Sequence, residues 1–190
     1  MLVVDVQNDF CPGGSLAVAQ GDQVALAINR YVERFTSAGA PIIATRDWHP
    51  AQTSHFNIYG GIWPVHCVQN SHGAEFHPAL RLGTSTVVVS KGTAPGADSY
   101  SGFDGVDASG AGLAELLRAG GVEQLFVGGL ATDYCVKQTV LDGLKHGFAV
   151  VVLLDAIRGV DLAPGDSVRA LDAMRHAGAR ELADYSQLRL

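Results

Sequence analysis

The hydrophobic positions of this chain follow two periods that alternate along its length. Short apolar runs such as "LVVDV" at 2–6 and "FAVVVLLDA" at 148–156 indicate strands. Between such runs, apolar residues recur every three or four positions, as at Val24, Ile28 and Val32, which is the spacing of an amphipathic helix. The pattern predicts strands over 2–6, 41–45, 85–91, 124–129, 148–156 and 180–183, and helices over 22–38, 110–119, 133–146 and 166–177.

This alternation of strands and helices defines a fold class. Parallel strands joined by helical crossovers place helices on both faces of the sheet. We therefore expect a three-layer α/β/α fold of the Rossmann-like kind, with a mainly parallel six-stranded sheet. The length of 190 residues suits one domain over 1–190. In such sheets ligands bind outside the carboxyl ends of the strands, so polar residues at those ends are the first candidates for a functional site.

Charge and cysteine content narrow the range of partners and compartments. A net charge of −6 argues against nucleic acid or an anionic membrane as a partner, and no apolar run approaches the roughly 20 residues of a membrane span. Three cysteines cannot all pair within the chain, and no secretory leader precedes the first predicted strand. We expect a cytoplasmic protein whose natural start lies a few residues upstream of Met1. The oligomeric state is open, and a homodimer is compatible with exposed sheet edges and long loops.

A long irregular stretch, 46–82, follows the second predicted strand and concentrates histidines. A loop of this length in a compact domain is usually functional or disordered, and its aromatic residues favour function. Imidazoles and a carboxylate suit one divalent ion such as zinc, iron or manganese. The candidate ligands are Asp47, His49 and His55, spaced Asp-x-His-x5-His, and His66 in "WPVHC". Spacing alone leaves a polar loop with scattered histidines as an equal alternative, and we expect His72, His77, His146 and His176 at the surface.

Cys135 is the candidate nucleophile. It follows a Gly-rich turn in "GGLATDYCVKQT", where a helix is predicted to begin, so we expect the helix dipole to lower the pKa of its thiol. Asp5 and Lys91 each end an apolar strand, where a charge needs a partner. They form either a structural ion pair or, with Cys135, a triad in which Asp5 accepts the thiol proton. We prefer the triad, although a lone cysteine is more often a small buried residue, the role assigned to Cys11 and Cys67.

Five segments, in order along the chain, resemble one known family. They are "VVDVQNDFCPGGSLAV" (3–18), "TRDWHPAQTSHF" (45–56), "WPVHCVQNSHGAEFHP" (63–78), "VVSKGTAPGADSYSGF" (88–103) and "GGLATDYCV" (128–136). Together they resemble the nicotinamidase/pyrazinamidase branch of the isochorismatase-like cysteine hydrolases, essentially end to end. The resemblance implies hydrolysis of nicotinamide to nicotinate and ammonia in NAD salvage, with pyrazinamide, converted to pyrazinoic acid, as a further substrate.

The resemblance also implies roles for individual residues. Asp5, Lys91 and Cys135 match the catalytic triad of the family. The backbone N–H groups of Ala131 and Cys135 match its oxyanion hole, with a cis peptide bond entering Ala131. In the implied mechanism Asp5 deprotonates the thiol, gives the proton to the leaving ammonia, and then activates the water that hydrolyses the thioester.

The same resemblance implies a metal centre and an aromatic pocket. Asp47, His49, His55 and His66 match the ligands of one divalent ion, zinc, iron or manganese, which is expected to meet the ring nitrogen of the substrate. Phe10 and Trp63 match the aromatic walls that hold the flat ring. The rest of the pocket is expected to be lined by Leu16, Tyr100 and Tyr134.

Three alternatives stay open at this point. A sister branch of the superfamily hydrolyses other small amides or a vinyl ether, but many of its members lack the Asp-x-His-x5-His loop. A metal-binding module on a decayed hydrolase fold is disfavoured because all three triad positions are filled. A redox role would need a second cysteine close to Cys135 in the sequence, and "ATDYCVKQT" has none.

Overall fold

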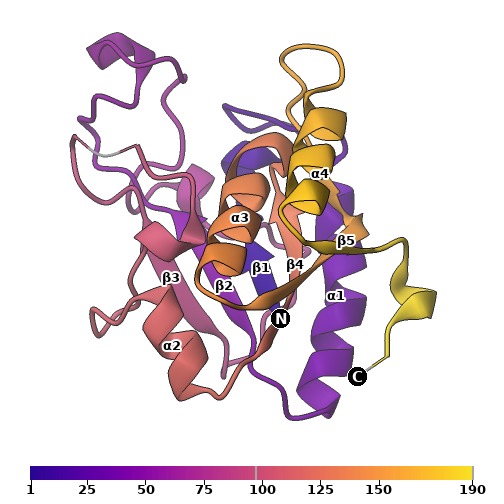
Figure 1. Cartoon of the computed structure of the whole chain (residues 1–190). Coiled ribbons are helices and arrows are strands. Elements are labelled where there is room, and N and C mark those ends of the chain that lie inside the picture. Colours follow the sequence, from indigo (N-terminus) through magenta and orange to yellow (C-terminus); the bar gives the residue numbers. More distant parts are fainter. Residues whose placement is uncertain (97, 190) are drawn as a thin grey trace.

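A computed structural model describes residues 1–96 and 98–189 and contains one six-stranded sheet (Figure 1). The strand order is β3-β2-β1-β4-β5-β6, and every neighbouring pair is parallel. This order is typical of doubly wound α/β folds. The predicted fold class is confirmed, with a sheet that is parallel throughout. The domain predicted over 1–190 includes Ala97 and Leu190, which lie outside the described residues.

The described residues contain each predicted strand and helix. The strands are β1 (Leu2–Val4), β2 (Ile43–Asp47), β3 (Val87–Lys91), β4 (Gln124–Leu130), β5 (Ala149–Arg158) and β6 (Arg180–Leu182). The helices are α1 (Gly21–Ser37), α2 (Leu113–Ala119), α3 (Lys137–Lys145) and α4 (Asp166–His176). Over these residues, no helix has both the length and the apolar composition that crossing a bilayer requires.

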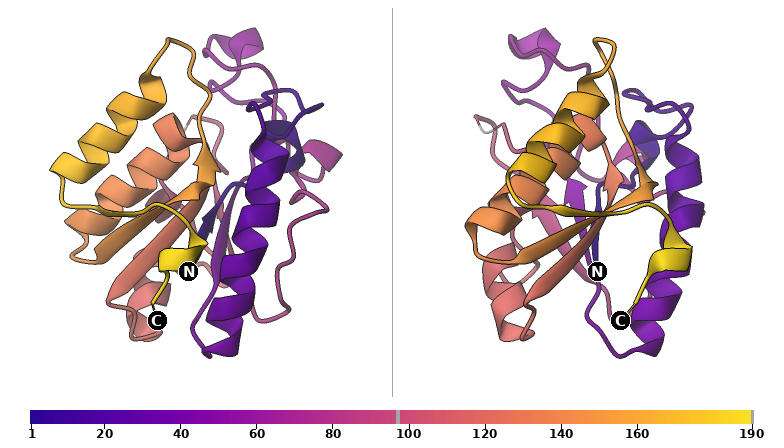
Figure 2. Two further views of the ribbon diagram at one scale, coloured as in Figure 1. Left: turned by 90° about the vertical axis from the view of Figure 1, so that its right-hand side faces the viewer. Right: turned by 45° about the vertical axis from the view of Figure 1, so that its right-hand side comes forward.

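The helices divide between the two faces of the sheet (Figure 2). On one face, α1 places Ile28, Val32 and Phe35 against Phe126 and Val151 of the sheet. On the other face, α2, α3 and α4 pack Leu117, Val140 and Met174 against alternate strand residues, including Leu2, Val127 and Val152. Successive residues of a strand point to opposite faces, so the central strands β1 and β4 have buried apolar residues or glycines at successive positions.

Several element boundaries differ from the predicted ones by a few residues, and three of these differences have clear local reasons. β1 ends at Val4 because Asp5 has a left-handed φ of 50°, which turns the backbone out of the strand. The helix predicted from residue 110 begins at Leu113, after a compact turn in which Asp107 accepts hydrogen bonds from the N–H groups of Ser109 and Ala111. The helix predicted over 133–146 consists of a π-helical turn, Thr132–Val136, followed by α3.

The long loops gather at the carboxyl edge of the sheet. The irregular stretch after β2 contains only short 3-10 turns, and Figure 1 shows part of it, in purple, projecting beyond this edge. The loop after β3 packs against it, since the Ser54 N–H donates to the Pro95 carbonyl at 2.9 Å. The sheet therefore offers a rigid edge on which these loops can build a site.

Candidate active site

Four adjacent strands each place a chemically active side chain at their carboxyl ends. Asp5 follows β1, Asp47 ends β2, Lys91 ends β3, and Cys135 lies in the π-helical turn after β4. Asp47 and Lys91 are directly paired in the parallel register of β2 and β3. Because these strands are neighbours in the order β3-β2-β1-β4, residues far apart in the chain converge.

Lys91 lies at the centre of this group. Its side chain is fully buried, and its Nζ lies 2.9 Å from Asp5 Oδ2 and 3.4 Å from Cys135 Sγ. The ammonium also contacts Asp47 Oδ1 and donates to the Ser99 carbonyl at 3.2 Å. Burial alone would lower the pKa of Lys91, but the charges of Asp47 and Asp5 raise it well above its ordinary value. The lysine is therefore a fixed positive charge at working pH.

Asp5 has the properties of a proton acceptor in a dry environment. Burial raises the pKa of its carboxyl group, and the Lys91 charge opposes that rise. Thr45 Oγ1 donates to Oδ1 at 2.7 Å, whereas Oδ2 forms the ion pair with Lys91 but accepts no hydrogen bond of good geometry from the described residues. Carboxylate oxygens of Asp5 and Asp47 and the Sγ of Cys135 lie within 4.8 Å of one another. An oxygen with a free lone pair thus lies close to the thiol.

Cys135 differs from the sequence-based expectation in one respect. Burial raises the pKa of its thiol well above the ordinary value, and the Lys91 charge only partly opposes this. The expected lowering by a helix dipole is wrong for the resting protein, because the thiol lies in a π-helical turn and is buried among two carboxylates. The resting Cys135 is a neutral thiol, so a neighbouring base would have to take its proton before it could act as a nucleophile.

The turn that carries Cys135 also frees a backbone donor. The peptide bond from Leu130 to Ala131 is cis, as the resemblance implied. The Ala131 carbonyl accepts from the N–H groups of Tyr134 and Val136, both at 3.1 Å, which closes the turn. The Ala131 N–H itself donates to no group in the described part of the chain. It is available as an oxyanion donor beside the thiol.

Three histidines of the irregular stretch converge next to this group. One ring nitrogen each from His49, His55 and His66 lies within 4.8 Å of the others, and all three side chains are buried. Their Nδ1 atoms meet the Gly92 carbonyl at 3.1 Å, Asp98 Oδ1 at 2.5 Å and the Pro64 carbonyl at 2.7 Å, respectively. A carbonyl or carboxylate oxygen only accepts, so each Nδ1 carries the hydrogen and each Nε2 offers a lone pair.

The remaining donor atoms fit a divalent metal ion. His49 Nε2 is buried and has no hydrogen-bond partner among the described residues, an arrangement that costs free energy unless a ligand fills it. Burial lowers the pKa of His55, and lowers that of His66 to about 4, so both rings are neutral, as metal ligands must be. Asp47 Oδ2 lies 3.7 Å from His49 Nε2, while its other oxygen contacts Lys91. Asp47 thus stands between the histidines and the thiol.

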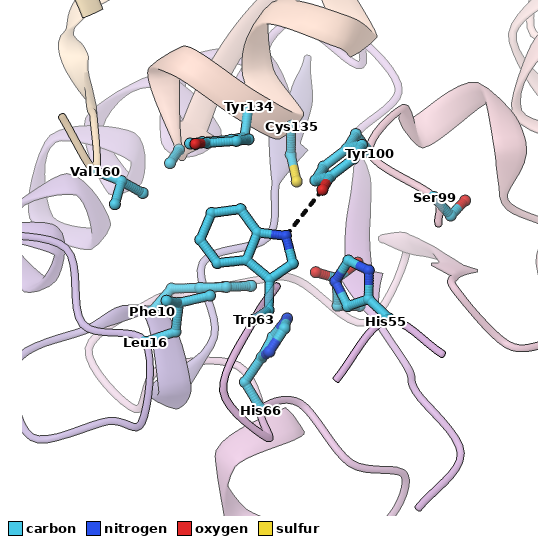
Figure 3. Close-up of a pocket in the computed structure, with 12 residues that line it drawn as sticks. Phe10, Leu16, His55, Trp63, His66, Ser99, Tyr100, Tyr134, Cys135 and Val160 are labelled. Atoms are coloured by element: carbon cyan, nitrogen blue, oxygen red, sulfur yellow. Dashed lines mark hydrogen bonds between the residues drawn. The ribbon is translucent and has the colours of Figure 1, made fainter. Parts of the chain in front are cut away.

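A largely aromatic pocket opens onto both groups (Figure 3). Its walls include the five residues expected to bind substrate: Phe10, Leu16, Trp63, Tyr100 and Tyr134. Asp47, His55, His66, Ala131 and Cys135 line the same pocket. The Trp63 indole N–H donates to the Tyr100 hydroxyl at 2.8 Å, and its ring meets Tyr134 edge-on with centroids 4.9 Å apart. In Figure 3 the sulfur of Cys135 points into this aromatic slot.

Other residues at the site were not assigned from the sequence. Gln7 is fully buried and clamps β2, because its side chain donates to the Asp47 carbonyl and accepts from the Asp47 N–H, both at 2.8 Å. Asp98, Ser99 and Val160 also contact or line the site. Val160 follows the carboxyl end of β5, so the strand-end rule could have found it. The roles of the other three depend on side-chain directions that spacing does not reveal.

Comparison with known proteins agrees with this arrangement. The chain matches the family model described as the isochorismatase domain over residues 1–183. A nicotinamidase of Escherichia coli is 43% identical over 98% of this chain and 96% of that protein, and a nicotinamidase/pyrazinamidase of Mycobacterium tuberculosis is 43% identical over 93% and 94%. The crystal structure of the pyrazinamidase of Pyrococcus horikoshii in complex with zinc superposes with a TM-score of 0.88 at 46% identity, over 95% of this chain and 96% of that one. The chain therefore belongs to the isochorismatase family.

Proposed function

We propose that this protein is a metal-dependent cysteine amidohydrolase that converts nicotinamide to nicotinate and ammonia, and pyrazinamide to pyrazinoic acid. One observation carries the proposal. The Cys135 thiol, buried among Lys91 and two carboxylates, lines the same aromatic slot as His55 and His66. His49 completes the histidine cluster, and its buried Nε2 has no hydrogen-bond partner among the described residues. A flat heteroaromatic amide can thus reach a nucleophile with its carboxamide and a metal-binding cluster with its ring nitrogen. The nicotinamidase and pyrazinamidase relatives support the same substrates.

The residues of this chain account for each step of the reaction. Asp5 takes the proton of Cys135, and the thiolate attacks the carboxamide carbon. The developing oxyanion lies by the N–H groups of Ala131 and Cys135. As the C–N bond breaks, protonated Asp5 gives its proton to the leaving ammonia, and then activates the water that cleaves the thioester to the carboxylic acid. Lys91 stabilises the negative charges that move between Asp5 and Cys135.

Asp47, His49, His55 and His66 would hold a single zinc, iron or manganese ion. When bound, such an ion supplies a Lewis acid that anchors the ring nitrogen and so orients the carboxamide. We place the activity in NAD salvage. We place the protein in the cytoplasm, because all three cysteines are free, which suits a reducing compartment. A homodimer stays a prediction, for which light scattering is the direct measurement.

The decisive experiment measures ammonia and nicotinate produced from nicotinamide by the native protein and by Cys135→Ala, with metal content determined on the same samples. We expect stoichiometric ammonia and nicotinate from the native protein, and no product from the variant, which still binds metal. Bound metal without any turnover of nicotinamide would point instead to a sister amidase with another small amide as substrate. Activity that survives in Cys135→Ala would overturn the nucleophile.

A further inference from the structure

Three consecutive residues after β3 each contact a different part of the site. Asp98 Oδ1 accepts from His55 Nδ1 at 2.5 Å. The Ser99 carbonyl accepts from Lys91 Nζ at 3.2 Å, and the Tyr100 hydroxyl accepts from the Trp63 indole at 2.8 Å. The segment 98–100 therefore connects the histidine cluster, the catalytic lysine and the aromatic wall, and Figure 3 shows Ser99 and Tyr100 on the same side of the pocket as His55.

The contact to His55 differs in chemistry from those of the other two histidines. His49 and His66 donate to neutral backbone carbonyls, whereas His55 donates to a carboxylate. A carboxylate behind an imidazole fixes its ring orientation and raises the basicity of the distal nitrogen, here Nε2. The His55 ring is buried, with 4% of its side chain exposed, while 61% of the Asp98 side chain is exposed. The carboxylate therefore acts on the cluster from its solvent side.

The loop that carries Asp98 is docked on the loop that carries His55. The Ser54 N–H donates to the Pro95 carbonyl at 2.9 Å, and His49 Nδ1 meets the Gly92 carbonyl at 3.1 Å. Two of the three histidines thus take their Nδ1 partner from the segment directly after β3. The Pro95 and Gly92 carbonyls belong to the backbone and are independent of side-chain identity. The Asp98 carboxylate is a side-chain group, so a point substitution of Asp98 removes its contact with His55 cleanly.

We propose that Asp98 is a positioning residue that locks the His55 ring and thereby sets how tightly, and how long, a divalent metal ion is held. The inference rests on the metal site of the proposed function. Outer carboxylates of this kind typically change metal affinity by about 10- to 100-fold. Since Asp98 is largely exposed and water screens its charge, we expect a value near the lower end, about 10-fold, for loss of the whole side chain.

The test uses the full chain, stripped of metal and reloaded with zinc. Asp98→Ala removes both charge and acceptor, and Asp98→Asn keeps an acceptor oxygen without the charge. The matched control is Glu75→Gln, which neutralises the carboxylate that faces Nδ1 of the exposed His72 at 3.1 Å, away from the cluster. For each protein, chelator competition gives the zinc dissociation constant, and excess chelator gives the release rate. Melting temperatures of the metal-free proteins and the visible spectrum of the cobalt-loaded forms complete the set.

We expect Asp98→Ala to bind zinc about 10-fold more weakly and to release it faster, with Asp98→Asn intermediate and Glu75→Gln unchanged. The cobalt spectrum should shift in the Asp98 variants, while the metal-free melting temperature stays at the native value. Unchanged zinc binding in both Asp98 variants would overturn the inference. If Asp98→Ala does not fold, the zinc affinity of Asp98→Asn alone is decisive. A native chain that binds no zinc would instead remove the proposed metal site, and the inference with it.

Discussion

At the scale of single residues, two buried carboxylates share one lysine and still take opposite roles. Burial raises the pKa of Asp5, whereas the Lys91 charge and the His49 side chain hold the pKa of Asp47 well below its ordinary value despite burial. Environments that separate two carboxyl pKa values assign acid–base roles to them. A mobile proton therefore belongs on Asp5, and Asp47 stays ionised as the permanent counter-ion of Lys91. Asp47 is then also the carboxylate that remains available to a metal.

Asp5→Asn tests this division. The amide has nearly the same shape as the carboxylate but cannot accept the Cys135 proton, so we expect kcat for nicotinamide to fall by about 10³-fold. Asp47 still neutralises Lys91, and the fold should therefore survive. Steady-state kinetics with a thermal melt on each sample checks both expectations. Thr45→Val, which removes only the hydrogen bond to Asp5 Oδ1, serves as the control and should lose far less activity. Asp5→Asn activity within tenfold of native would contradict the role of Asp5 as the base.

At the scale of elements, β4 determines the shape of the turn that carries Ala131 and Cys135. Gly129 has a φ of 135°, and a Cβ at this position would lie 1.9 Å from the Val4 carbonyl oxygen. The β4–β5 register also shifts between Val127 and Gly129. Only glycine lets β4 approach β1 this closely one residue before Leu130 and the cis bond. The Gly-rich motif is thus a packing requirement of the strand as much as a feature of the turn.

We expect Gly129→Ala to lower the free energy of unfolding by at least about 3 kcal/mol, because the methyl group has to displace a backbone carbonyl. Gly147→Ala is the matched control. Gly147 also has a positive φ, of 88°, but a Cβ at this position would meet nothing within 4 Å, so we expect a cost of only about 1 kcal/mol. Urea unfolding of both variants measures this difference. If the two variants lose the same free energy of unfolding, the positive φ alone, and not the close approach to Val4, explains the need for glycine at position 129.

The turn after β4 is also tied to the loop after β5. The buried Asp133 side chain accepts from the Val160 N–H at 2.9 Å and the Asp161 N–H at 2.8 Å, and Val160 lines the pocket. We expect Asp133→Ala to release the backbone of Val160 and Asp161 and so loosen this side of the pocket. Substrate binding should weaken, so KM for nicotinamide should rise several-fold with a smaller change in kcat. Asp172→Ala, which removes a carboxylate from an exposed pair on α4, should leave KM unchanged. A fall in kcat at constant KM would contradict the assignment.

The elements also show what the sequence could predict about the site and what it could not. Apolar runs locate the strand ends, and these are enough to bring Asp5, Asp47, Lys91 and Cys135 together, since parallel strands share one edge. The π-helical turn was predicted as part of an ordinary helix, because one extra residue per turn leaves the apolar period nearly unchanged over so short a segment. The raised pKa of Cys135 and the pairing of Asp98 with His55 depend on burial and side-chain direction, which spacing does not encode.

At the scale of the whole molecule, buried thiols make the fold sensitive to alkali. Burial raises the pKa of Cys67 and Cys135 well above the ordinary 9.0, and that of Cys11 to about 11. In the unfolded chain these thiols lose their protons near pH 9, whereas the folded chain keeps them. The unfolded state then binds fewer protons, so the free energy of unfolding falls as pH rises above that value.

We expect each thiol that stays protonated in the fold to reduce the free energy of unfolding by about 1.4 kcal/mol per pH unit above the ordinary thiol pKa. Urea unfolding under reducing conditions, on the metal-free protein between about pH 8 and pH 10, measures the slope. The slope for Cys67→Ala should be shallower by about 1.4 kcal/mol per pH unit, the contribution of one thiol, whatever the stability of this variant at neutral pH. A slope that is the same in native protein and variant would contradict the burial argument.

The position of Lys91 on β3 has a consequence for the activity of chains that have not finished folding. β3 is an edge strand of the sheet, and the thiol lies beyond β1 and β4, so the lysine reaches its partners only when the edge strand is in register with β2. Until that pairing forms, a nascent or partly opened chain lacks the cation that contacts both Asp5 and Cys135 in the folded protein. Such a chain lacks the charge that stabilises the thiolate, so we expect it to form no thioester with the substrate. We therefore expect catalytic turnover only from molecules in which β3 has paired with β2.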